Sequence, residues 1–137
     1  MLRIDVPIDL AALANAQERI EAFLAAESAP ESLILRVRLV VEELFANLVM
    51  HGRFAVQPPP AARLAVALAG GVAQVTIEDA AAPFDPRPVA APVAVADISQ
   101  VPIGGLGLPL VRRMAHILAY GPTESGWNRT ELLVAGT

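Results

Sequence analysis

The sequence contains no cysteine and no lysine, and each absence excludes a class of site. Without cysteine there is no disulfide framework, no cysteine-ligated zinc and no thiol nucleophile. All ten basic residues are arginine, whereas a P-loop nucleotide site and a eukaryotic-type protein kinase both need a lysine at the phosphates. A nucleotide site in this protein therefore has to work by another route.

Long apolar runs are also absent. No segment reaches the length that crosses a membrane, and the start of the chain, Met1 to Asp5, does not have the pattern of a signal peptide. The formal net charge of -4 does not favour nucleic acid or an acidic membrane surface as a partner. We therefore expect a cytoplasmic protein that binds neither, with residues 1–137 forming a single domain.

The clearest pattern in the chain is a helix that runs from about Pro30 to Met50 and is ended by Gly52. Apolar residues recur at helical spacing along it: Leu33, Val37, Val41, Leu44, Phe45 and Leu48. Glu43 and Asn47 are four residues apart, so both lie on one helix face, one turn apart. A half-buried acid and amide are costly unless they have partners. Nearby backbone groups could satisfy them, or they could belong to a site; the helix pattern leaves both interpretations open.

The remaining elements follow from the same rules. In chain order we expect a strand at 2–7, a helix at 10–26 capped by Asp9, strands at 63–69 and 72–79 joined by Gly70-Gly71, a helix from the glycine cluster at 104–108 to about Leu118, and a closing hairpin of 119–121 with 127–134.

The end of the second central strand carries an acid. Val75 and Ile77 share a face, and the two-residue period of a strand puts Asp79 on the same face, pointing into the core. A carboxylate there can accept a hydrogen bond from the exocyclic amine of adenine. An aspartate before a loop can equally form a turn, and the sequence pattern supports both interpretations.

A long loop and a glycine cluster follow this acid. Residues 83–103 contain five prolines and no glycine, as expected of a lid or binding loop, with a short strand at 92–96 as the competing interpretation. The cluster Gly104-Gly105-Leu106-Gly107-Leu108 then opens a helix. Glycines permit close backbone approach and a helix start suits a phosphate, although a flexible hinge would also use glycine.

Three motifs taken in order resemble a known family. These are Glu43-x-x-x-Asn47, Asp79 followed by Phe84-Asp85-Pro86, and the glycine cluster at 104–108. Together they resemble the ATP-binding domain shared by gyrase, heat-shock chaperones, histidine kinases and MutL (GHKL), over about residues 3–134. Within that superfamily the chain is most similar to the small anti-sigma-factor serine/threonine kinases. The resemblance implies the Bergerat fold, an α/β two-layer sandwich with a mixed, mostly antiparallel sheet covered on one face by three helices, and an ATP lid at 83–103.

The resemblance also assigns roles to individual residues. It makes Asn47 a ligand of the Mg²⁺ that bridges the phosphates, Glu43 the general base, and Asp79 the acceptor for adenine. It assigns nucleotide contacts to Phe84, Gly104, Gly105, Leu106, Gly107, Leu108 and Thr130. The chain departs from the family at three positions: Ala81 stands where a glycine is usual, no arginine lies near Val101, and His116 stands where an aspartate is frequent. Of these, Ala81 touches the site itself and puts nucleotide binding in doubt.

The function that the resemblance implies is Mg²⁺- and ATP-dependent phosphorylation of an anti-sigma-factor antagonist protein. A sigma factor is the second expected partner, and a homodimer is common in such proteins. The alternatives are a non-catalytic protein-interaction module of the same fold, with reduced or lost ATP binding, and a histidine-kinase-like ATPase domain.

Overall fold

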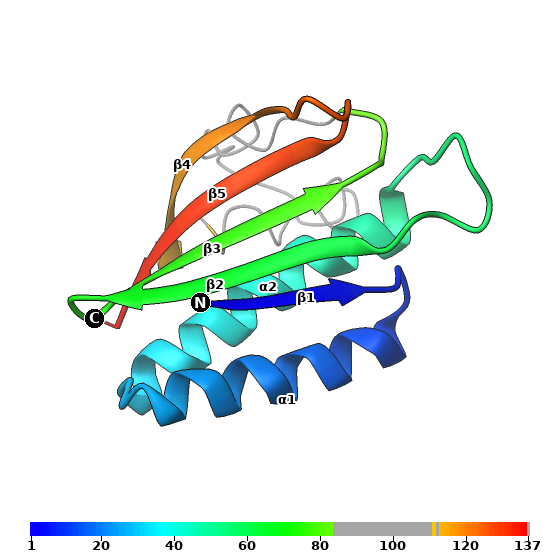
Figure 1. Ribbon diagram of the computed structural model, residues 1–137. Helices are drawn as coiled ribbons and strands as arrows, with labels where there is room; N and C mark the ends of the chain where they lie inside the picture. The colour runs from blue at the N-terminus through cyan, green and yellow to red at the C-terminus, as the bar shows by residue number, and fades with distance from the viewer. Residues whose placement is uncertain (84–110, 112, 137) are drawn as a thin grey trace, which may run out of the picture.

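The computed structural model describes residues 1–83, 111 and 113–136. In chain order the elements are β1 (Leu2–Val6), α1 (Leu10–Ala26), α2 (Glu31–His51), β2 (Ala62–Ala69), β3 (Val72–Asp79), β4 (Ala115–Pro122) and β5 (Asn128–Ala135). The strands form one sheet in the order β1-β2-β3-β5-β4, and both helices pack against one face of it (Figure 1). The predicted two-layer α/β sandwich is confirmed.

The sheet and the helix layer each differ from the prediction in one respect. All four pairings between the described strands are antiparallel, so the expectation of a mixed sheet is wrong for this part of the chain. Antiparallel neighbours can be joined by a two-residue turn or by a longer connection, whereas parallel neighbours require a crossover connection. Within the described residues two helices with full bounds, α1 and α2, cover the sheet, where three were predicted; Val111, Arg113 and Met114, just before β4, are also helical. The third is expected to begin at 104–108, which lies outside them.

Local signals set the helix ends as predicted. Asp9 caps α1 by accepting a hydrogen bond from Ala12 N at 2.7 Å. α2 ends at Gly52, whose N–H donates to Leu48 O at 3.0 Å. A Cβ at Gly52 would collide with the Leu48 carbonyl oxygen and lie 2.7 Å from Cε2 of Phe54, so a glycine is needed there. None of the helices that the structure describes is long and apolar enough to span a bilayer.

The predicted β2–β3 hairpin is confirmed. Gly70 and Gly71 form its turn with φ angles of 58° and 77°. Both angles are positive, as a two-residue hairpin turn of this kind requires, and glycine adopts them without a steric penalty. The turn thereby fixes the register of the two strands, with Leu64 opposite Ile77.

The last hairpin begins earlier than the sequence pattern predicts. We expect a helix to about Leu118, but β4 already occupies Ala115–Pro122, so the helix prediction is wrong for its last four residues. Val111 and Ala115 are both buried and four residues apart, which fits a helix. Covered and exposed side chains alternate from Ala115 to Ala119, which fits a strand equally well. Pairing with β5, in which Ala115 lies opposite Val134, decides between the two patterns.

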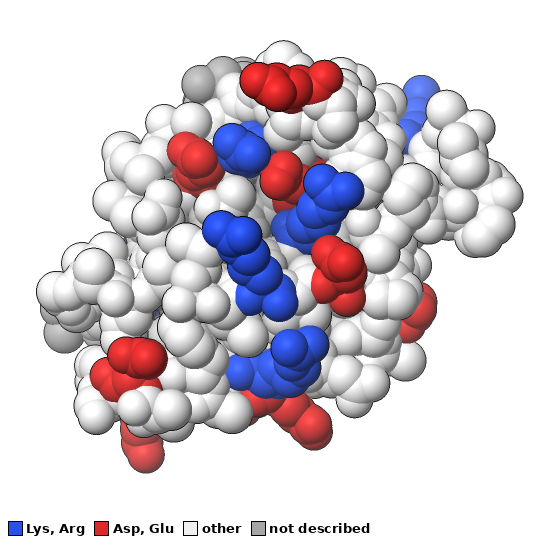
Figure 2. Space-filling model, viewed as in Figure 1, with Lys and Arg blue, Asp and Glu red and all other residues white. Residues whose placement is uncertain are grey.

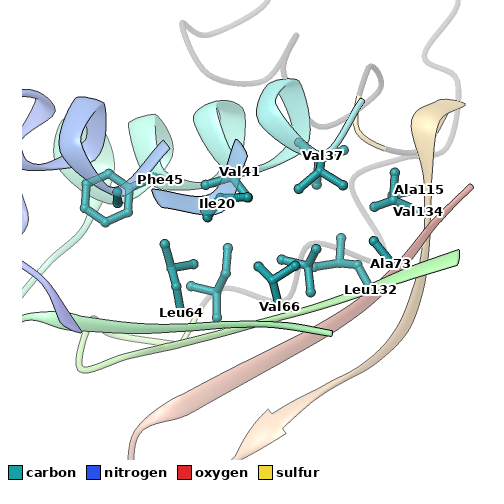
Figure 3. Close-up of a cluster of buried hydrophobic side chains, with 14 of the residues drawn as sticks. Ile20, Val37, Val41, Phe45, Leu64, Val66, Ala73, Ala115, Leu132 and Val134 are labelled. Atoms are coloured by element: carbon teal, nitrogen blue, oxygen red, sulfur yellow. The ribbon is translucent and has the colours of Figure 1, made fainter. Parts of the chain in front are cut away.

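The core lies between α2 and the sheet. Phe45 is the largest of its fully buried side chains. Figure 3 shows residues of the helices on one side of the cluster and residues of the strands on the other: Ile20, Val37, Val41, Phe45, Leu64, Val66, Ala73, Ala115, Leu132 and Val134. This packing fixes the face of α2 that meets the sheet, and therefore also the direction of the polar residues next to it.

Replacing Phe45 by alanine should lower the free energy of unfolding by about 3–5 kcal/mol, because the sheet cannot close the cavity left by the ring. Urea unfolding measures the loss. Leu35→Ala on the same helix is the matched control: Leu35 is 56% exposed, and its loss should be about 0.5 kcal/mol or less. Equal losses in the two variants would contradict this placement of α2.

Candidate functional site

The site begins with one acid at the end of β3. Because the hairpin register is fixed and side chains alternate along a strand, Asp79 lies on the same face as Ile77, toward the helices. Asp79 is only 7% exposed. The prediction that this carboxylate points into the core from the strand end is confirmed.

Two donors hold one oxygen of this carboxylate. The backbone N–H of Ala81 donates to Oδ1 of Asp79 at 3.0 Å, and Nδ2 of Asn128 donates to the same oxygen at 3.2 Å. Nδ2 of Asn128 also donates to the carbonyl oxygen of Ala81 at 2.7 Å. Among the described residues no group donates to Oδ2.

Burial raises the pKa of Asp79 above its ordinary value of 3.8, because removal from water disfavours the charged carboxylate. The hydrogen bonds from Asn128 and from the Ala81 N–H favour the charged form and offset part of this rise. The two donors therefore do not fully compensate the burial. A third donor, placed on Oδ2, would stabilise the carboxylate further.

The alanine at position 81 fits its backbone conformation. Among the non-glycine residues that the structure describes, only Ser28 has a positive φ, so Ala81 does not occupy a conformation that requires glycine. The methyl group that replaces the family's usual glycine therefore adds no backbone strain. Its main-chain N–H and C=O instead take part in the hydrogen bonds to Asp79 and Asn128.

A short backbone contact ties the end of α2 to the end of β3. Phe54 and Ala81 form an isolated antiparallel bridge, and Ala82 N donates to Arg53 O at 2.7 Å. The residues just after α2 therefore lie beside the residues just after β3. Figure 1 shows these two element ends at the same end of the molecule.

Glu43 and Asn47 lie near this end of α2, and both are half-buried. In the part of the chain that the structure describes, neither side chain forms a hydrogen bond or an ion pair. Asn47 is five residues before Gly52, which is about 7.5 Å along a helix axis. Glu42, the neighbouring acid, is exposed. Within the described residues the polar atoms of these two half-buried side chains therefore face solvent or a ligand.

The structure places one further predicted contact and does not describe the others. Thr130 is buried, and it lies opposite Ile77 in the β3–β5 pairing, on the helix-facing side of the sheet. Phe84 and the glycine cluster at 104–108 lie outside the described residues, as does the lid from residue 84 onward. Their assignment stays a prediction.

Asn128 is the residue that the sequence interpretation missed. It lies directly opposite Asp79 in the sheet and is 4% exposed. Its burial could have been inferred, because Asn128, Thr130 and Leu132 alternate with outward-facing residues. Its pairing with Asp79 could not, because 49 residues separate the two and no local pattern sets the register between β3 and β5.

The face of the sheet that points away from the helices carries charged side chains (Figure 2). Figure 2 shows arginine and acidic side chains gathered on it. By register, one row across four strands alternates in charge: Asp5, Arg63, Glu78 and Arg129. An open hollow of about 560 Å³ lies on this face, and Ala65 is among the residues that line it. Neither Asp79 nor the site residues of α2 line this hollow, so it is separate from the candidate site.

A buried strand-end acid joined to a helix that carries a carboxylate and an amide is the arrangement expected of an ATP-binding domain of the predicted superfamily. The model of the histidine kinase-like ATPase domain family matches residues 6–132. The chain therefore belongs to this family, and the predicted superfamily is confirmed. Membership of an ATPase domain family supports ATP as the ligand.

No curated protein matches the chain. Among solved structures, a chain from "The crystal structure of SiaB-SiaC complex from Pseudomonas aeruginosa" is similar, with 20% sequence identity and a TM-score of 0.55. The match covers 98% of this chain and 89% of that chain. At this identity the similarity shows a shared fold over nearly the whole length.

Asp79→Asn should make the protein more stable at neutral pH, because the amide oxygen can accept both existing hydrogen bonds and no charge is buried. Because the pKa of Asp79 is raised, the folded protein binds a proton at this carboxylate more readily than the unfolded protein does. The free energy of unfolding of the wild type therefore falls as the pH rises through that pKa. The advantage of the variant should therefore shrink as the pH falls toward 3.8.

Urea unfolding at several pH values between roughly 4 and 8 measures the difference in free energy of unfolding between Asp79→Asn and the wild type. Glu124→Gln, in the exposed β4–β5 turn, removes one negative charge without burial and should change stability by about 0.5 kcal/mol or less. An advantage of Asp79→Asn that grows toward low pH would contradict the burial of the charge.

Proposed function

We propose that the protein is a cytoplasmic serine/threonine kinase of the anti-sigma type, which uses ATP and Mg²⁺ to phosphorylate a small anti-sigma-factor antagonist protein. The observation that carries the proposal is the pair Glu43 and Asn47, half-buried and unpaired among the described residues, on the helix whose following residues pair with those after Asp79. Polar groups in such a place need partners, and a bound nucleotide with its metal supplies them.

The environment of Asp79 fits the adenine base. Its Oδ1 already accepts two hydrogen bonds, whereas Oδ2 accepts none from the described residues. The exocyclic amine of adenine is a donor that matches this vacant acceptor. Thr130, buried on the same side of the sheet, is the proposed polar residue behind the base.

The donor set on α2 fits Mg²⁺. The side-chain oxygen of Asn47 is a hard ligand, and it has no competing partner among the described residues. Within the same residues no three His, Cys, Asp or Glu side chains are grouped to hold a metal. A cation at Asn47 would therefore take most of its ligands from phosphate oxygens and water, as Mg²⁺ commonly does at nucleotide sites.

Glu43 is the proposed general base. When bound, Mg²⁺-ATP supplies the transferable γ-phosphoryl group and the metal offsets charge on the phosphates. With that group bound, Glu43 would accept the proton of the serine hydroxyl as its oxygen bonds to phosphorus and the bond to the ADP leaving group breaks. Glu43 and Asn47 are one helical turn apart, so the proposed base and the proposed metal ligand are neighbours on one helix face.

The partners of the proposed kinase are proteins. The similar solved structure is described as a complex of two proteins, SiaB and SiaC, which supports a protein partner for this chain as well. We propose the antagonist as substrate and a sigma factor as the alternative partner. A homodimer remains a prediction.

Calorimetric titration with ADP, with and without Mg²⁺, tests the site. We expect binding in the micromolar range, about -8 kcal/mol, that depends on Mg²⁺. Asn47→Ala should abolish the metal-dependent part, because the protein ligand of the cation is lost. Glu43→Ala should keep the affinity but lower phosphoryl transfer by roughly 10²–10⁴-fold, the usual contribution of a positioned base.

Glu42→Ala is the matched control for the second variant, because it removes the adjacent exposed acid of the same helix. It should change neither binding nor turnover. Equal losses of affinity and turnover in Glu43→Ala would exclude it as the base. A folded wild-type protein that binds no nucleotide would favour the non-catalytic interaction module.

A further inference from the structure

We infer that Asn128 is a positioning residue that makes the site selective for adenine over guanine nucleotides, by fixing the orientation of the Asp79 carboxylate. The inference rests on the proposed function and adds a residue to it. Asn128 lies outside the three motifs that carry the family resemblance.

Asn128 is placed by the sheet itself. It is the first residue of β5, opposite Asp79, the last residue of β3, and its side chain is 4% exposed. Its amide nitrogen contacts Oδ1 of Asp79 at 3.2 Å and the carbonyl oxygen of Ala81 at 2.7 Å. Both partners are acceptors, so the NH₂ group and not the amide oxygen has to face them. Its two N–H bonds are thereby both used.

This arrangement fixes the plane of the Asp79 carboxylate and therefore the direction in which its second oxygen points. Asn128 and the Ala81 N–H both donate to Oδ1, so rotation of the carboxylate would break two hydrogen bonds. Oδ2 is thus presented as a pure acceptor. Adenine carries an amino group at the position where guanine carries a carbonyl oxygen. A fixed, ionised acceptor attracts the first and repels the second.

Asn128 also favours the ionised form of the carboxylate. Its hydrogen bond lowers the pKa of Asp79 against the rise caused by burial. Glu78 and Arg129, the charged neighbours along the two strands, lie on the opposite face of the sheet. Without the Asn128 donor, more of Asp79 would be protonated at a given pH. A protonated carboxyl group can donate a hydrogen bond to the guanine oxygen, so selectivity should fall.

The bond to Ala81 gives Asn128 a second effect at the site. It holds the backbone that follows β3 at the point where Ala81 bridges Phe54. Loss of the amide would therefore release both the carboxylate and the main chain next to it. A purely structural residue would affect the binding of all nucleotides alike, whereas a positioning residue changes the ratio between them.

The experiment compares Mg²⁺-ADP and Mg²⁺-GDP binding to wild type, Asn128→Ala and Asn128→Asp by calorimetry across the pH range. Asn128→Asp keeps the shape of the side chain, removes both N–H donors and puts a second carboxylate beside Asp79, which raises the pKa of the pair further. In both variants we expect the ADP/GDP preference to fall about tenfold or more, the effect of one lost hydrogen bond to a charged group. In a plot of ADP affinity against pH, the loss of affinity at low pH (the acid limb) should also move to higher pH, because Asp79 protonates more readily.

Asn15→Asp is the matched control, because it makes the same chemical change at an exposed position of α1. It should leave the preference and the pH profile unchanged. Thermal unfolding shows that each variant is folded. If the alanine and aspartate variants do not fold, Asn128→Ser, which keeps one donor, should show an intermediate loss of preference.

The outcomes separate this inference from the proposed function. A wild type that binds neither nucleotide contradicts both. A wild type that binds ADP, together with Asn128 variants whose ADP/GDP ratio and acid limb equal those of wild type, overturns the positioning role alone. The same holds if the variants lose both nucleotides equally with an unshifted acid limb.

Discussion

The structure of the candidate site depends on how one buried carboxylate is satisfied. A charge in the position of Asp79 is costly unless donors surround it. The backbone of Ala81 supplies one donor and Asn128 supplies another, both to the same oxygen. The second oxygen accepts no hydrogen bond from the described residues, and burial raises the pKa of Asp79 in spite of the two donors. The hydrogen bonds that let the fold tolerate this acid are therefore the same ones that orient it in the proposed adenine site.

The site also depends on a link between elements that are distant in sequence. The bridge between Phe54 and Ala81 joins the chain after α2 to the chain after β3. Since a helix is stiff, the position of its end fixes the position of Glu43 and Asn47 one to two turns earlier. Packing of Phe45 against the sheet sets the rotation of the helix. The buried apolar face and the half-buried polar pair are consequences of the same helical period.

The two faces of the sheet carry different kinds of side chain. The face toward the helices is apolar except at its end, where Asp79, Asn128 and Thr130 are buried. The open face has a row of alternating charges and a hollow lined partly by small side chains. Because a strand alternates with a period of two, neighbouring residues such as Glu78 and Asp79 belong to different environments: one is paired with Arg129 on the open face and the other is buried beneath the sheet.

Local signals in the sequence were sufficient for the helices, the first hairpin and the buried direction of Asp79. Asp9, Gly52 and Gly70-Gly71 act on their immediate neighbours, so their effects can be inferred without knowing what lies nearby. The early start of β4 could not be inferred, because the segment before Leu118 fits both helical and strand periods until it pairs with β5. Only tertiary structure placed Asn128 against Asp79, since the pairing of strands distant in the chain is set by the packing of the whole sheet.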